Sequence, residues 1–245
     1  MPAEKQPIPS VWARPRPKRE QPSLSRDRIV SEAIQLLDAE GIDALSMRSL
    51  GARLGAGATS LYRHVANKDE LIELVVDEIY GEVRVPAADP AHWRAAVTDS
   101  AHSLRSMVLR HPWVVSVLGQ VGLAYLGPNL MRQSERMLAL FRAAGFAADE
   151  ADQAMKLLIA YVIGMTTSEA AYLSVLARSG QNEQDWLESL RPTTEEALQE
   201  YPLLRDGRAT AQTKDPEQLR ADSFVYGVER ILDGLESRLG RTSAR

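Results

Sequence analysis

The sequence predicts an all-α fold, and three observations support this. Apolar residues recur at intervals of three and four positions from Leu24 to Leu239, which is the spacing of one helical face. No stretch of the chain alternates apolar and polar residues as a half-buried strand does. N-cap residues, glycines and prolines separate the periodic segments, where helices begin and end. We therefore expect about nine or ten helices.

The composition is that of a globular protein and excludes several kinds of chemistry. The chain has 245 residues, of which 44% are hydrophobic and 25% charged, enough for one large domain or two small ones. It has no cysteine, which excludes disulfides, thiolate metal sites and cysteine nucleophiles. It has no run of about 18 apolar residues and no secretory signal pattern. We expect a cytoplasmic protein without a membrane-spanning helix.

The N-terminal part predicts four helices, the middle two of them short. Ser25 is an N-cap for a helix over Arg26–Glu40, and Gly41 ends that helix. Ser46 begins a helix over 47–54, and a turn at 55–57 leads to a helix over 58–65. Asn67 and Glu70 form a capping box for a helix that continues to about residue 83.

The remainder of the chain predicts longer helices after a break at Pro86 and Pro90. We expect helices near 91–110, 112–122, 128–144, 149–178, 182–200 and 216–239, with a loop over 201–215. The resulting organisation is an N-terminal arm over 1–22, a domain over 23–83 and a second domain over 91–240.

Charge is distributed unevenly along the chain, although the net charge is −4. Residues 1–28 hold seven basic and three acidic residues, and residues 1–70 hold 11 basic and nine acidic residues. Residues 71–245 hold 18 basic and 24 acidic residues. A basic end on an acidic chain indicates a polyanionic partner for that end.

The segment 46–65 has the form of a helix-turn-helix, two short helices joined by a glycine-containing turn. In that motif the second helix places its N-terminal residues in the major groove of double-stranded DNA. Thr59 and Ser60 are small and can bond to base edges or phosphates. Phosphate contacts are expected from Tyr62, Arg63, His64 and Lys68. The alternative is an ordinary helical hairpin without DNA.

The longer segment 24–79 resembles the DNA-binding domain of the tetracycline repressor (TetR) family along its whole length. The shared features are Glu40-Gly41-Ile42, Leu45-Ser46-Met47-Arg48, Leu61-Tyr62-x-His64-Val65 and Asn67-Lys68-x-x-Leu71. The resemblance implies a homodimeric transcriptional regulator whose remaining helices bind a small molecule and a second subunit. By position, Arg48 matches an arginine that can reach a guanine. Ala58 stands where the tetracycline repressor has a glutamine that contacts bases, so the operators should differ.

The N-terminal arm is basic and stiffened by proline just before the first helix. Arginines in such an arm are attracted to the minor groove beside a helix-turn-helix. The alternative is a solvated tail. The arm residues expected to contact DNA are Arg14, Arg16, Lys18 and Arg19.

Two long helices, 149–178 and 216–239, carry wide apolar faces. In the family that the chain resembles, the corresponding helices pair with their counterparts in a second subunit, so the resemblance implies a homodimer. The alternative is burial within one subunit. The residues expected at the dimer interface are Met155, Ile159, Val162, Phe224, Val228, Ile231 and Leu235.

Large adaptable side chains in the second domain suit a bulky, flat ligand, with two glutamines to orient it. The alternative for each is a plain core position. The histidine that links magnesium in the tetracycline repressor falls on Val117, so tetracycline is not supported, and we expect no metal or cofactor. The candidate ligand-binding residues are Met107, Trp113, Val117, Gln120, Met131, Gln133, Phe141, Tyr161 and Met165.

These features together predict a homodimeric repressor that a small, bulky aromatic or antibiotic-like molecule releases from a palindromic DNA operator. One alternative is a DNA-binding regulator that answers to a protein partner and binds no small molecule. A helical enzyme is a further alternative, although the sequence has no zinc-protease, nucleophile-elbow or phosphate-loop motif. We expect no catalytic residues and no membrane partner.

Overall fold

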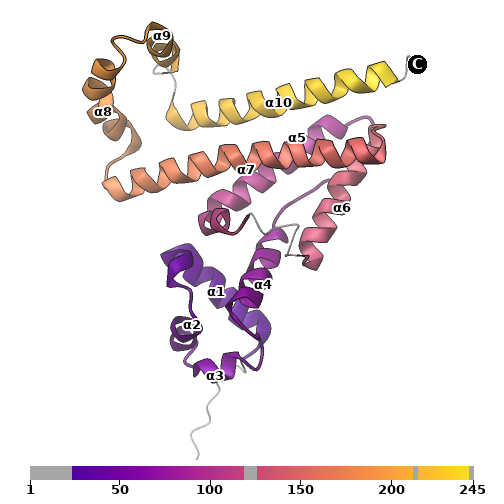
Figure 1. The fold of residues 1–245 in the computed structure, drawn as a ribbon, viewed down its shortest axis with the longest axis vertical. Coiled ribbons are helices and arrows are strands. Elements are labelled where there is room, and N and C mark those ends of the chain that lie inside the picture. Colours follow the sequence, from indigo (N-terminus) through magenta and orange to yellow (C-terminus); the bar gives the residue numbers. More distant parts are fainter. Residues whose placement is uncertain (1–23, 119–125, 212–214, 243–245) are drawn as a thin grey trace, which may run out of the picture.

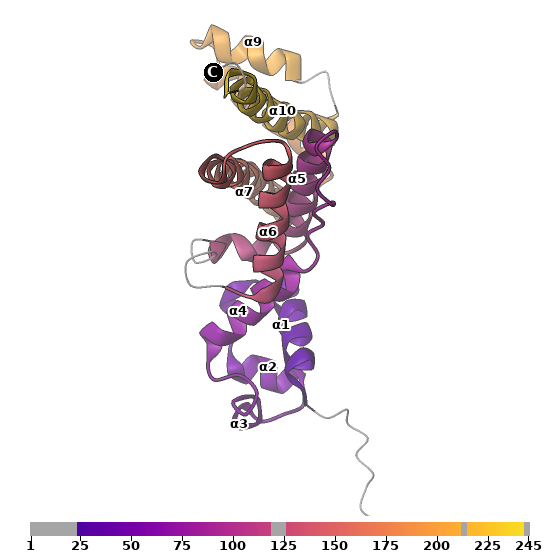
Figure 2. The ribbon, with the colours of Figure 1, turned by 90° about the vertical axis from the view of Figure 1, so that its right-hand side faces the viewer.

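The computed structural model describes residues 24–118, 126–211 and 215–242, and over these ranges it consists of helices and their connections without a strand. The predicted all-α class is therefore confirmed. The molecule is elongated, with its N-terminal helices at one end and two long helices, α7 and α10, at the other (Figures 1 and 2).

The N-terminal end contains α1 (Arg26–Glu40), a 3-10 turn (Ile42–Ala44), α2 (Met47–Arg53), α3 (Ala58–Leu61) and α4 (Lys68–Tyr80). The predicted caps are present. The Ser25 side chain accepts a hydrogen bond from the amide of Arg28 at 3.2 Å, and Gly41, at φ +81°, ends α1. The Asn67 side chain accepts from the amide of Glu70 at 2.8 Å and begins α4. These local bonds explain why the sequence located the helix starts well.

The C-terminal part contains α5 (Trp93–Arg110), η3 (Pro112–Ser116), α6 (Pro128–Ala143), α7 (Ala148–Ser179), α8 (Glu183–Ala197), α9 (Pro202–Ala211) and α10 (Pro216–Thr242). Helices α7 and α10 lie side by side, with α5 packed against both (Figure 1). Helix α6 connects this layer to α4, since it contacts α4, α5 and α7. One hydrophobic core therefore runs from Ile29 in α1 to Leu232 in α10.

Three predicted elements are wrong in extent. The helix expected over 58–65 is α3, of four residues, because the carbonyl of Leu61 accepts from the amides of both His64 and Val65 and the chain tightens into a turn. The helix expected over 112–122 is a 3-10 helix that ends at Ser116 within a valine-rich stretch, and residues 119–125 lie outside the described residues. The loop expected over 201–215 contains α9, which begins at a proline, a residue favoured in a first helical turn.

Candidate DNA-binding surface and regulatory core

Helices α2 and α3 are held in a fixed relation by two glycines. Gly55 adopts φ +64° in the turn, a conformation that favours glycine. A Cβ added to Gly51 would lie 2.8 Å from the carbonyl oxygen of Ala56, so α2 can approach the turn this closely because residue 51 has no side chain. Leu54 and Leu61 are buried on either side of the turn. The arrangement is a helix-turn-helix with its second helix fixed by packing.

Helix α2 is also attached to α1 and begins at a reciprocal cap. Ser46 and Ser49 each accept a hydrogen bond from the other's amide at 3.0 Å, which fixes the first turn of α2. Arg53 at its end donates to Glu32 at 2.8 Å and to Glu40 at 3.4 Å, both on α1. The sequence did not identify these ion pairs, since their partners are 13 and 21 positions away.

The predicted DNA contacts in the described residues share one end of the molecule, remote from α7 and α10 (Figures 1 and 2). Arg48 on α2 and Thr59 and Ser60 on α3 are exposed. Tyr62, Arg63 and Lys68 are exposed, and His64 is half-buried. The surface that α2, α3 and the start of α4 present is therefore rich in hydrogen-bond donors and free of intramolecular cover. The predicted arm residues Arg14, Arg16, Lys18 and Arg19 lie outside the described residues.

A buried histidine connects α1 to the C-terminal part of the chain. His111, which is 3% exposed, follows α5, and its Nδ1 lies 2.7 Å from Oδ1 of Asp38 on α1. Its Nε2 lies 3.2 Å from Oε1 of Glu82, in the connection after α4. The indole Nε1 of Trp113 donates to the same Asp38 oxygen at 2.7 Å. Asp38 thus links η3 to α1 directly.

A second connection joins α4 to α6. Oδ1 of Asp77 accepts hydrogen bonds from the amides of Asn129 and Leu130, both at 2.9 Å. These amides belong to the first turn of α6, where no earlier carbonyl is available to them. Asp77 therefore caps α6 from a different helix and joins α4 to α6.

The candidate ligand-binding residues divide into three groups. Met107, Trp113, Val117, Gln133 and Phe141 are buried in the core among α5, η3, α6 and α7, and Oε1 of Gln133 has no hydrogen-bond partner there. Tyr161 packs against α10, and its hydroxyl donates to the carbonyls of Ser223 and Phe224 at 3.1 Å. Met131 and Met165 are exposed, and Gln120 lies outside the described residues.

The candidate dimer residues also separate by burial. Three of them are buried within the single chain: Val162, Phe224 and Val228 are 0%, 1% and 0% exposed. For these three the structure shows burial within one subunit. Met155, Ile159, Ile231 and Leu235 are partly exposed at the edge of the same faces. Helices α7 and α10 also expose large apolar side chains that the sequence analysis did not single out, among them Leu157, Val175 and Tyr226.

Helix α7 is long and apolar enough to cross a membrane by length and composition, and 17% of its most apolar window is buried within the chain. It packs on α5, α6, α8, α10 and η3. Much of its apolar surface is thus uncovered in a single copy.

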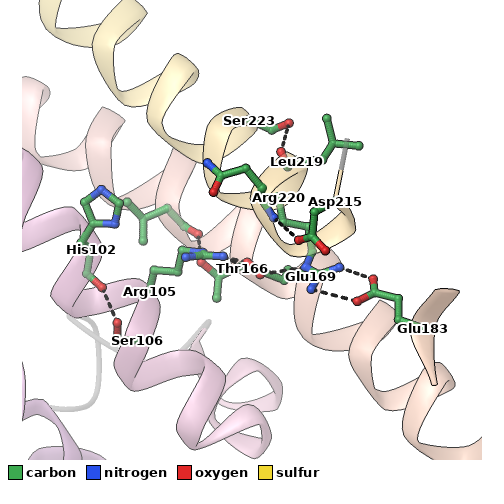
Figure 3. A network of polar contacts seen from close by, with 12 residues as sticks. His102, Arg105, Ser106, Thr166, Glu169, Glu183, Asp215, Leu219, Arg220 and Ser223 are labelled. Carbon is green, nitrogen blue, oxygen red and sulfur yellow. Dashed lines mark hydrogen bonds and ion pairs between the residues drawn. The ribbon is translucent and has the colours of Figure 1, made fainter. Parts of the chain in front are cut away.

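A network of charged residues joins α5, α7, α8 and α10 (Figure 3). Arg105 donates to Glu169 through Nε at 2.7 Å and through a terminal nitrogen at 2.5 Å. Arg220 pairs with Glu183, which also accepts from the Tyr172 hydroxyl at 2.6 Å. Burial and the neighbouring Glu183 raise the pKa of Tyr172 to about 12, so its phenol remains a donor. No single spacing identifies this network, because its members come from four helices.

Metal ligands do not gather in the described part of the chain: no group of three or more histidine, aspartate or glutamate side chains there is placed to hold an ion.

Two family descriptions match the chain over nearly all of the described residues. "Bacterial regulatory proteins, tetR family" matches residues 29–75. "Tetracyclin repressor-like, C-terminal domain" matches residues 85–239. The HTH-type transcriptional repressor DrrR1 of Streptomyces coeruleorubidus is 35% identical over 229 residues, which cover 90% of this chain and 81% of DrrR1.

Solved structures show the same arrangement of helices. ActR of Streptomyces coelicolor in complex with actinorhodin superposes with a TM-score of 0.73 at 32% identity, covering 88% of this chain and 97% of ActR. BioQ with its double-stranded DNA operator superposes with a TM-score of 0.55 at 31% identity, covering 62% of this chain and 89% of BioQ.

The fold and the exposed helix-turn-helix define a DNA-binding transcriptional regulator. The chain belongs to the TetR family. The resemblance drawn from segment 24–79 is therefore confirmed and extends over the C-terminal helices.

Proposed function

We propose that this regulator is a homodimeric, cytoplasmic repressor that an aromatic, antibiotic-like molecule releases from a palindromic operator. The observation that carries the proposal is the exposed surface of α2 and α3, where Arg48, Thr59 and Ser60 stand on a helix-turn-helix fixed by glycine packing. Phosphate contacts come from Tyr62, Arg63, His64 and Lys68, and the basic arm over 1–22 adds minor-groove contacts. The DNA-binding domain extends over 23–83, and the effector and dimer domain over 91–240.

Two relatives support the two binding partners in this proposal, operator DNA and a small molecule. BioQ has been solved with a double-stranded DNA operator, and ActR with actinorhodin. In this chain Asp38 and Asp77 connect the helix-turn-helix domain to η3 and α6. A molecule that displaces η3 or α6 therefore moves α1 and α4, and with them the spacing of two recognition helices in a dimer.

Dimerisation is supported by the apolar side of α7 and α10. Leu157, Val175 and Tyr226 are 50%, 43% and 63% exposed in a single copy, and large exposed apolar side chains on neighbouring helices are typical of interaction surfaces. Twofold symmetry would place two copies of α3 on successive turns of the duplex, which matches a palindromic operator. No metal or cofactor is required in this mechanism.

The test separates base contacts from phosphate contacts, using an operator duplex that the wild-type protein selects from a random pool. Thr59→Ala together with Ser60→Ala should weaken operator binding by about 1–3 kcal/mol and change binding to unrelated DNA little. Lys68→Ala should weaken binding to both and reduce the salt slope by about 0.9.

Fluorescence anisotropy at several salt concentrations measures both effects. Glu188→Ala, on the distant helix α8, is the control and should bind as the wild type does. Equal losses on both duplexes for the Thr59 and Ser60 variant would contradict base contact by α3. An operator complex that no aromatic molecule dissociates would favour the protein-responsive alternative.

A further inference from the structure

A buried histidine with a carboxylate at each ring nitrogen lies where the helix-turn-helix domain meets the C-terminal helices. His111 follows α5 and is 3% exposed. Its Nδ1 lies 2.7 Å from Oδ1 of Asp38 on α1, and its Nε2 lies 3.2 Å from Oε1 of Glu82, in the connection after α4. Both distances are those of N–H···O hydrogen bonds. One ring therefore connects the C-terminal helices to α1 and to the end of α4.

The protonation state of this ring determines how many of its two contacts are hydrogen bonds. A neutral imidazole has one N–H donor and one acceptor nitrogen, whereas an imidazolium donates from both nitrogens. An ionised carboxylate only accepts, so a neutral ring bonds to Asp38 or to Glu82 but not to both. The contact of Nδ1 with Asp38 is the shorter one, and a neutral ring with its proton on Nδ1 keeps it. A second proton, taken up at Nε2 from solvent, adds the bond to Glu82.

The charges around the ring are balanced when it carries this second proton. Among the described residues, the charged groups that face it are Asp38 of α1 and Glu82 of the connection after α4. Arg110, at the end of α5, pairs with the same Glu82. The adjoining side chain of η3 is Trp113, which has no charge. A protonated His111 thus gives two positive and two negative charges, and the buried imidazolium is paired on both sides.

We propose that His111 is a proton-sensitive joint between the two domains, and that protonation of Nε2 fixes the helix-turn-helix domain against the C-terminal helices through Glu82. The inference rests on the proposed function, because it adds regulation by pH to operator binding. Histidine is the side chain whose charge ordinarily changes between about pH 5 and 8. The bond to Glu82 is present while Nε2 is protonated and is lost as the pH rises. Operator affinity is therefore higher at the acidic end of this range.

The first test reads the ring directly, by nitrogen NMR of isotope-labelled histidine side chains in the full-length protein. Glutamine substitutions of the other three histidines, His64, His92 and His102, assign their signals and leave that of His111. This ring should carry both protons at about pH 6 and lose the one on Nε2 by about pH 8. A ring that is already neutral at about pH 6, or that keeps both protons at about pH 8, would overturn the inference.

The second test measures operator affinity by fluorescence anisotropy across this pH range at constant ionic strength. His111→Gln removes the titrating ring. Glu82→Gln, at a partly exposed position, leaves an amide that can accept from a charged ring or donate to a neutral one. The control is His92→Gln, an exposed histidine that pairs with Asp89 in its own segment. His64 titrates in all of these proteins, so its effect cancels when a variant is compared with the wild type.

Between about pH 6 and about pH 8, wild-type affinity should fall about tenfold further than that of His111→Gln, as expected for one hydrogen bond to a charged group. Glu82→Gln should flatten the profile in the same direction, and His92→Gln should follow the wild type. Circular dichroism checks that each variant is folded, and Glu82→Gln decides the result if His111→Gln is not.

Parallel profiles for the wild type and the Glu82→Gln variant would overturn the inference, while operator binding and the proposed function would stand. A wild-type protein that selects no operator at any pH would contradict the proposed function instead, and the NMR titration would still test the joint.

Discussion

The contact between Gly127 and Asp77 determines how α6 begins. Gly127 occupies the N-cap position of α6, where a side-chain oxygen usually accepts from the first turn. Glycine has no such oxygen, and the carboxylate of Asp77 replaces it from α4. A Cβ at position 127 would overlap the Cβ, Cγ and Oδ1 atoms of Asp77, so the small residue is what permits the approach.

We expect Gly127→Ala to displace the Asp77 side chain and to break both of its hydrogen bonds to α6. The loss should lower the free energy of unfolding by about 0.5–2 kcal/mol, the usual effect of removing a helix cap. Urea denaturation followed by circular dichroism measures this change. The control is Gly207→Ala on α9, where an added Cβ meets no atom within 4 Å. A Gly127→Ala protein as stable as the wild type would show that Asp77 does not support α6.

The hydrogen bond from Trp113 to Asp38 gives a second prediction at this scale. Trp113→Phe keeps an aromatic ring in the core but removes the indole donor. Of the two bonds to this Asp38 oxygen, the one from Trp113 is lost and the one to His111 remains. Stability should fall by about 1 kcal/mol, the typical net value of one hydrogen bond. The same denaturation experiment measures it, with Trp186→Phe as the control, since Trp186 makes an edge contact with Tyr172 on α7. An equal effect of both substitutions would assign the loss to ring size.

At the scale of the element, the relation of α2 to α3 is the feature on which DNA binding depends. Both helices are short, so neither is stable alone, and packing of Leu54 and Leu61 holds them. The close approach of Gly51 to the Ala56 carbonyl sets the angle at which α3 leaves the turn.

We expect Gly51→Ala to push the turn away from α2 and to reorient α3, because the added methyl group would meet backbone rather than a movable side chain. Operator affinity should fall by at least about tenfold, while the C-terminal helices remain folded. Gly57→Ala, two residues past the left-handed Gly55, has open space around its Cβ and is the control. Anisotropy measures binding, and circular dichroism checks the fold. Unchanged affinity of the Gly51 variant would contradict a fixed helix-turn-helix angle.

The elements also show which parts of the fold are local. Caps at Ser25, Ser46 and Asn67 were predicted because the capping side chain and its amide lie within three residues. The end of α3 was not predicted, because it depends on the burial of Val65 in the core. The cap of α6 was not predicted either, because it is a contact between distant residues: Asp77 lies 52 positions from Asn129.

For the whole molecule, the exposed apolar side chains of α7 and α10 predict a dimer. Tyr226→Glu or Leu157→Glu would bring a charge into a surface that two copies bury together, at a cost of several kcal/mol without a counter-charge. Light scattering after gel filtration should show a monomer for these variants and a dimer for the wild type. Operator affinity should fall with the loss of the second half-site.

The matched control for this experiment is Ser106→Glu, on the exposed surface of α5. It adds the same charge away from the proposed interface and should remain dimeric. A Tyr226→Glu protein that is still a dimer would show that subunits associate through a different surface.

The sequence by itself determined the all-α class, the position of the helix-turn-helix and the family, because each depends on patterns within a few turns of chain. Periodicity located the apolar faces of 149–178 and 216–239 as well. Apolar spacing does not determine whether such a face is covered by the same subunit or by a second one. Only the tertiary structure showed that Phe224 and Val228 are covered within the subunit, whereas Tyr226 is left outside.

The sequence did not predict the charged network either. Arg105, Glu169, Glu183 and Arg220 come from four helices, and each alone is an ordinary surface charge on its helix. Their pairing follows from the way α5, α7, α8 and α10 pack. Local hydrogen bonds and periodicity fix elements within the chain, while contacts between distant residues exist only once those elements have packed together.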